Sequence, residues 1–97
     1  MIGIDKIDSI VADVVRKNLG QKLFQRTFSE PAVASDGGEA LRITIVIAPK
    51  AAAKLKGDSI LDTLVQIHGK LIEAGEERFP IIEYATEDEL ADADSES

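Results

Sequence analysis

The stretch ALRITIVIA, residues 40–48, decides the fold, because it carries the strongest strand pattern in the chain. Every second residue from 41 to 47 is a large aliphatic one: Leu41, Ile43, Ile45 and Ile47. On the opposite face Val46 is also apolar, and only Arg42 and Thr44 are polar. Such period-two alternation is typical of a β-strand, and an apolar strand of this kind aggregates when it is left unpaired. We therefore predict a well-paired strand at 40–48.

Two amphipathic helices are predicted, one before and one after this strand. Residues 4–19 place apolar side chains at steps of three and four, and Gly20 provides a C-terminal cap. DSILDTLVQIHGKLIEAG, residues 58–75, carries two neighbouring apolar ridges. The first ridge contains Ile60, Leu64, Ile67 and Leu71, and the second contains Leu61, Val65 and Ile72. We expect Asp58 or Ser59 to cap this helix, with Asp62 three residues after Ser59 as in a capping box.

Shorter patterns predict the remaining elements. KLFQRTFSE (22–30) and RFPIIEYAT (78–86) alternate as strands, and Pro80 indicates an edge or strand-opening position. PAVASDGGE (31–39) has the composition of a turn, and PKAAAKLKG (49–57) predicts one short helical turn before a break at Gly57.

The resulting order is α-β-β-(short α)-α-β. Since a helix connects the second strand to the third, these two strands should be parallel, with the helix on one face. We predict an α+β fold, a three-stranded mixed sheet with two main helices on one face, forming a single domain at 1–86. On the other sheet face we expect an apolar patch drawn from Leu23, Phe24 or Phe28, with Val46 and Ile82 or Tyr84, which favours dimerisation or partner docking.

The net charge of −7 is concentrated at the C-terminal end. Residues 1–56 hold nine Lys and Arg against six Asp and Glu, whereas residues 57–97 hold two against twelve. Thr86 and Glu89 have capping-box spacing, so a short helical turn should start at Glu87. We expect 87–97 to be an acidic, partly disordered tail.

The chain contains no cysteine, which excludes disulfides, thiolate metal sites and cysteine nucleophiles. The start, MIGIDKIDSIVADVV, carries three aspartates that a secretory signal would not tolerate, and no apolar run reaches bilayer-spanning length. We expect a cytoplasmic protein with no membrane partner.

Catalytic and metal-binding patterns are missing from the sequence. His68 is the single histidine, and Ser59 lies two to three helical turns away from it, too far to form a nucleophile–base pair. The carboxylates around Asp58, Asp62 and Glu73 lack the spacing of a calcium loop and are expected to form a solvated helix face. We predict no catalytic residue, no metal and no cofactor, and therefore a protein that is not an enzyme.

The acidic end is the candidate partner-binding segment. An acidic segment can dock on a basic surface and imitate phosphate, and Leu90 would be its apolar anchor. The residues assigned to this site are Tyr84, Glu87, Asp88, Glu89 and Leu90. We predict a small protein-interaction or regulatory module, acting as an adaptor or as a neutraliser of a basic partner. The partner is a protein or a second copy in a homodimer; otherwise the tail only solubilises the chain.

The basic residues support an alternative, a phosphate or nucleic-acid patch. It comprises Arg16, Lys17, Lys22, Arg26, Lys50, Lys54 and Lys56. The element order resembles that of type II KH domains and BolA-like proteins. The resemblance is one of topology: KLKGDS has one glycine where KH domains have a Gly-rich backbone-clamping loop, and the basic, His-containing helix start of BolA-like proteins is missing. It implies a nucleic-acid-binding domain of KH-like topology as the second hypothesis.

Overall fold

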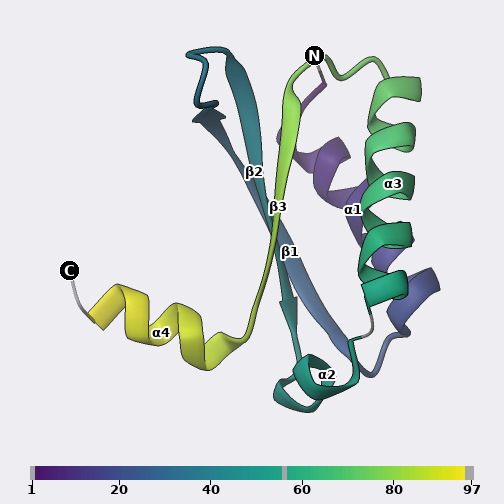
Figure 1. Ribbon diagram of the computed structural model, residues 1–97, viewed down its shortest axis with the longest axis vertical. Helices are drawn as coiled ribbons and strands as arrows, with labels where there is room; N and C mark the ends of the chain where they lie inside the picture. Colours follow the sequence, from purple (N-terminus) through teal and green to yellow (C-terminus); the bar gives the residue numbers. More distant parts are fainter. Residues whose placement is uncertain (1, 56, 96–97) are drawn as a thin grey trace.

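The structure is a computed structural model that describes residues 2–55 and 57–95. Its elements are α1 (Ile4–Leu19), β1 (Phe24–Val33), β2 (Glu39–Ile47), α2 (Pro49–Lys54), α3 (Gly57–Glu73), β3 (Phe79–Ala85) and α4 (Glu87–Ser95). The strands form one sheet, α1 and α3 cover one of its faces, and α4 projects on the opposite side (Figure 1). The predicted α+β architecture is confirmed. Within the described ranges no helix is long and apolar enough to cross a bilayer.

The apolar stretch at 40–47 supplies the central strand, β2. The strand order is β1-β2-β3, with β1 antiparallel and β3 parallel to β2. The parallel pair follows from the crossover through α2 and α3, because only a long connection returns the chain to the same end of the sheet. Both backbone edges of β2 are therefore paired, which removes the aggregation hazard that its apolar sequence would otherwise carry.

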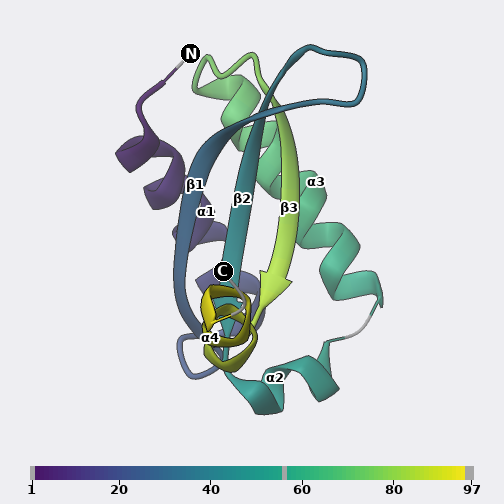
Figure 2. The ribbon, with the colours of Figure 1, turned by 90° about the vertical axis from the view of Figure 1, so that its left-hand side faces the viewer.

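The core fills the space between the sheet and the two long helices, which lie behind the sheet in Figure 2. Its fully buried side chains include Ile7, Val11 and Val15 of α1, Leu41, Ile43 and Ile45 of β2, and Ile67 of α3. Burial of aliphatic surface, at about 25 cal/mol per Å², is the main stabilising contribution of such a layer. The core is almost wholly aliphatic, as the scarcity of aromatic residues requires.

The sheet face away from the helices differs from the expectation of a broad apolar patch. Ile82 and Tyr84 pack on the helix side, because the parallel register places them beside Ile43 and Ile45. Phe24 lies opposite Ile47 on the same side, and Leu23, in the turn before β1, also packs against the core. The outer face carries ion pairs instead. Arg26 pairs with Glu87 at 3.0 Å and Arg42 pairs with Glu83 at 3.7 Å. Phe28 and Val46 do lie on this face, and the Arg26 guanidinium stacks over the Phe28 ring at 5.2 Å.

Three element boundaries also differ from the sequence prediction. β1 continues through Pro31 to Val33 instead of ending at residue 30, which an edge strand tolerates because one backbone edge needs no partner. α3 begins at Gly57, so the predicted caps Asp58 and Ser59 lie inside its first turn. There the carboxylate of Asp58 interacts favourably with the positive end of the helix dipole. α4 spans nine residues, longer than one turn.

Candidate interaction surface on helix α3

The second apolar ridge of α3 lies in solvent. Leu61, Val65 and Ile72 expose 60%, 63% and 60% of their surface, whereas Ile67 and Leu71 of the first ridge are buried. A helix that lies on a sheet buries one face, so a second ridge next to the first has no neighbour to pack against. The spacing of four and seven residues aligns the three exposed side chains in a single row.

His68 and Phe79 extend this row toward the sheet. The imidazole of His68 meets the Phe79 ring edge to face, with ring centroids 6.1 Å apart and an interplanar angle of 76°. Phe79 opens β3 and is itself 60% exposed. We call Leu61, Val65, His68, Ile72 and Phe79 the α3 ridge. It is the largest group of exposed apolar side chains on neighbouring elements of the described chain.

Acidic side chains flank the ridge on its outer side. Asp58, Asp62 and Glu73 are all exposed, and none of them forms an ion pair with a described residue. At 100° per residue, they lie roughly 50–110° round the helix from the centre of the ridge. The ridge is therefore an apolar row beside negative charge that no described residue pairs with, a composition that suits a partner with apolar and basic groups.

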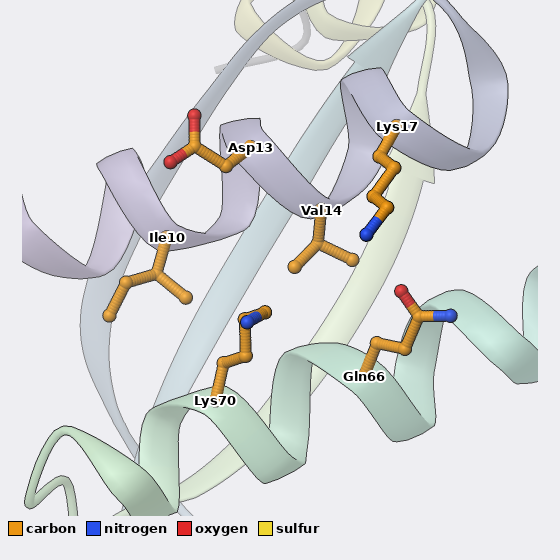
Figure 3. A pocket seen from close by; sticks show the side chains of 6 residues that line it. All are labelled: Ile10, Asp13, Val14, Lys17, Gln66 and Lys70. Atoms are coloured by element: carbon orange, nitrogen blue, oxygen red, sulfur yellow. The ribbon is translucent and has the colours of Figure 1, made fainter.

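A groove runs along the opposite flank of α3, between this helix and α1 (Figure 3). Its volume is about 400 Å³, and Ile10 and Val14 of α1 form its apolar wall. Lys17 of α1 and Lys70 of α3 extend into it from opposite sides. The groove is open to solvent, and the described lining residues include no acid apart from Asp13.

The residues assigned to the acidic segment are largely engaged within the domain. Glu87 accepts hydrogen bonds from Nε and Nη2 of Arg26 at 3.1 and 3.0 Å, and this contact lowers the pKa of Glu87. The Thr86 N–H donates to Glu89 at 3.2 Å and the Glu89 N–H donates to the Thr86 hydroxyl at 3.3 Å. The predicted capping box is thus confirmed. Asp88 remains exposed and Leu90 is half-buried.

Tyr84 is separated from the rest of that segment. Its ring packs against the core on the helix side of the sheet, whereas α4 projects on the other side (Figure 1). Its hydroxyl is buried and has no hydrogen-bond partner among the described residues. Burial raises the pKa of the Tyr84 phenol. The structure therefore does not bring Tyr84 together with Glu87, Asp88, Glu89 and Leu90.

The predicted basic patch is divided between two regions. Lys22 lies in the turn before β1, and Lys50 lies in the first turn of α2; these segments meet where the Ala48 N–H donates to the Leu23 carbonyl at 2.8 Å. Arg16 and Lys17 end α1 near the same end of the molecule (Figure 1). Arg26 is on the outer sheet face instead, paired with Glu87. The Lys54 side chain and Lys56 lie outside the described residues.

No group of three or more His, Cys, Asp or Glu within the described ranges is arranged to hold a metal ion. Comparisons with protein-family models, with curated proteins and with solved structures found no match to this chain. The α3 ridge is thus identified by its exposure alone. Both ridges of this helix are visible in the sequence. A helix that packs on one sheet buries one apolar row, so the presence of two rows was the signal that one of them stays exposed.

Proposed function

We propose that this protein is a small cytoplasmic protein-interaction module that binds its partner through the α3 ridge and serves as an adaptor or regulator. The observation that supports this proposal is the exposed row of Leu61, Val65 and Ile72. Full burial of an exposed aliphatic side chain contributes about 1.5–3 kcal/mol, and since about three fifths of each of these surfaces is still exposed, each would contribute roughly 1–2 kcal/mol to a complex. The proposal requires no catalytic group and no cofactor.

The negative charge of residues 57–97 favours a basic partner, in line with a neutralising role. Because Glu87 and Glu89 already have partners within the domain, the ridge replaces the acidic segment as the primary contact. The exposed Asp88 then acts at longer range, by increasing the rate of encounter with a basic surface.

A photo-crosslinking amino acid at Val65 tests this function. We expect it to join the domain to a specific protein in cells, whereas the same group at Ser9, exposed on the flank of α1 beside β1, should not. Substituting both Leu61 and Ile72 by glutamine should abolish the product. Equal crosslinking from Val65 and Ser9, or none from Val65, would contradict the proposal. Sedimentation analysis of the purified protein shows whether the crosslinked partner is a second copy.

A second candidate function is nucleic-acid binding, supported by the meeting of the Lys22 turn and the Lys50 helix at one end of the domain. Lysines that neutralise phosphates give an affinity that falls steeply with salt. The test is a salt titration of RNA and DNA binding with a variant that lacks residues 87–97, in which the acidic residues cannot compete. Absence of binding at low salt would exclude this function.

A further inference from the structure

The α3 ridge has the geometry of a helix-packing seam. Residues 61, 65, 68 and 72 follow steps of four, three and four, which is the spacing of the apolar positions in a coiled coil. At 100° and 1.5 Å per residue these side chains fall within an arc of roughly 60° and span about 16 Å. A row this narrow and this straight matches one face of another helix for about three turns.

Gly69 provides a second observation on the same face. It lies in the middle of α3 beside Val65 and is exposed, and a Cβ added to it would meet no atom within 4 Å. No contact inside the described domain therefore requires glycine here, although glycine is a poor helix former. Glycine at this position leaves the backbone open, so a second helix can approach α3 closely along the ridge.

The charges beside the seam indicate which helix fits. Asp62 takes the position next to the seam where coiled coils place their interhelical ion pairs, and Asp58 and Glu73 add negative charge on the same side. A second copy of this chain, docked about a twofold axis, would bring both sets of carboxylates into one interface. Like charges at such an interface disfavour the pair, whereas lysine or arginine beside the partner's apolar face would find oppositely charged groups.

From the seam spacing, the exposed Gly69 and the carboxylates beside the seam, we infer that the partner of the α3 ridge is a basic amphipathic helix. The inference rests on the proposed function and adds the chemical class of the partner: apolar side chains at seam spacing contact Leu61, Val65 and Ile72, and flanking lysine or arginine side chains pair with Asp58, Asp62 and Glu73. The domain thereby selects its partner by charge as well as by the apolar contact.

Two synthetic peptides test this inference. Both are helices about 21 residues long with the same leucine seam, and one has lysine at the flanking positions whereas the other has glutamate. Repulsion between like charges keeps each peptide from associating with itself. Fluorescence anisotropy at low salt should show that the lysine peptide binds the domain at least about tenfold more tightly, with a difference that shrinks as salt is added. Chemical-shift changes should fall on residues 58–73.

Two matched variants locate the binding. The neutral substitutions Leu61→Gln and Val65→Gln together should remove lysine-peptide binding while leaving the fold intact, since both positions are exposed. Asp62→Lys with Glu73→Lys should reverse the preference for lysine over glutamate, whereas Asp88→Lys on α4 should not. Thermal unfolding of each variant confirms that the domain remains folded.

Other outcomes overturn the inference and are distinguishable from failure of the proposed function. Equal affinity for the two peptides, or lysine-peptide binding that survives the Leu61 and Val65 substitutions, contradicts a basic helix on the ridge. A dimer that those same substitutions dissociate shows that a second copy occupies the seam. If Val65 crosslinks to a partner whose contacting segment is acidic or neutral, the function stands and the inference fails; if Val65 crosslinks to nothing, the function itself fails.

Discussion

The carboxylate of Glu76 accepts hydrogen bonds from Nε and Nη2 of Arg78 at 3.0 and 2.9 Å, and the side chain of Glu76 in this pair is fully buried. Glu76 also accepts from the Ile2 N–H at 3.2 Å, and Arg78 donates to the Ile2 carbonyl at 3.2 Å. The pair therefore ties the start of the chain to the connection between α3 and β3. The contact with Arg78 is the main reason that the pKa of Glu76 falls to about 2.

This pair predicts an acid-sensitive fold. Since the pKa of Glu76 is lower in the folded chain than its ordinary value of 4.5, its contribution is fully present above that value and is lost as the pH falls toward 2. Glu76→Ala should reduce the free energy of unfolding at pH 7 by about 3 kcal/mol, because it leaves the largely buried guanidinium of Arg78 without its carboxylate partner. Urea unfolding between pH 7 and 2 measures both effects. The exposed Glu77 is the control. An equally large loss of stability in Glu77→Ala would contradict the assignment of this effect to the Glu76–Arg78 pair.

Asp8 predicts a pH dependence of the opposite sign. Burial is the main cause that raises the pKa of this carboxyl, and the hydrogen bond from the Ser29 hydroxyl at 2.6 Å opposes the rise. A raised pKa means that the stabilising contribution is present at low pH and is lost as the pH rises through the folded-state value. Asp8→Asn keeps an acceptor for the Ser29 hydroxyl. It should leave the free energy of unfolding at pH 7 equal or higher, and it should remove the part of the pH dependence that is due to Asp8. A clear loss of stability at pH 7 would show that the charge of Asp8 is required.

The capping box at Thr86 predicts a local effect. Thr86→Ala removes the acceptor for the Glu89 N–H, which should cost α4 about 1 kcal/mol. Because α4 projects away from the sheet, the midpoint of global unfolding should hardly change (Figure 1). Amide hydrogen exchange at residues 89–91 should accelerate about fivefold, while Thr86→Ser retains protection. An unchanged exchange rate in Thr86→Ala would show that the box does not stabilise α4.

The fold was predictable because its main signals are local. Alternation in 40–48 and the three- and four-residue steps of 4–19 specify a strand and a helix whatever surrounds them. The face of β3 that points outward was harder to predict, since it depends on pairing between residues far apart in the chain. The register that sets Ile82 beside Ile43 and Tyr84 beside Ile45 decided it, and for that reason these two residues were wrongly expected in an apolar patch on the outer sheet face.

The candidate site was only half visible in the sequence. Leu61, Val65 and Ile72 were recognised as a row, but whether a row is core or surface depends on what packs against it. The acidic segment drew attention through its charge, yet Glu87 is paired with Arg26, a partner that only the tertiary structure shows. Glu89 is engaged in the local capping box that its spacing from Thr86 had predicted. A run of charged residues is visible in the sequence, whereas whether each side chain is free to bind a partner depends on its contacts in the folded domain.

Two isoleucines on α3 provide a matched test of the exposed ridge. Ile67 is completely buried and Ile72 is 60% exposed. Ile67→Ala should reduce the free energy of unfolding by about 3–4 kcal/mol through lost burial and a residual cavity. Ile72→Ala should change it by less than about 0.5 kcal/mol, as for other exposed positions. Chemical denaturation of the two variants in parallel decides; a large loss in Ile72→Ala would mean that the ridge packs within the domain.

Gly69 predicts a gain in stability at the expense of binding. Gly69→Ala should stabilise the free domain by about 0.5–1 kcal/mol, because alanine is the better helix former and its Cβ meets no neighbouring atom. The same methyl group occupies the surface that a partner helix would approach, so the affinity for the lysine peptide should fall severalfold. Gln66→Ala, on the α1 side of the helix, should leave that affinity unchanged. If Gly69→Ala is more stable but binds the lysine peptide with the same affinity, the partner helix does not approach the backbone at this position. The contact would then lie on the side of the ridge formed by His68 and Phe79.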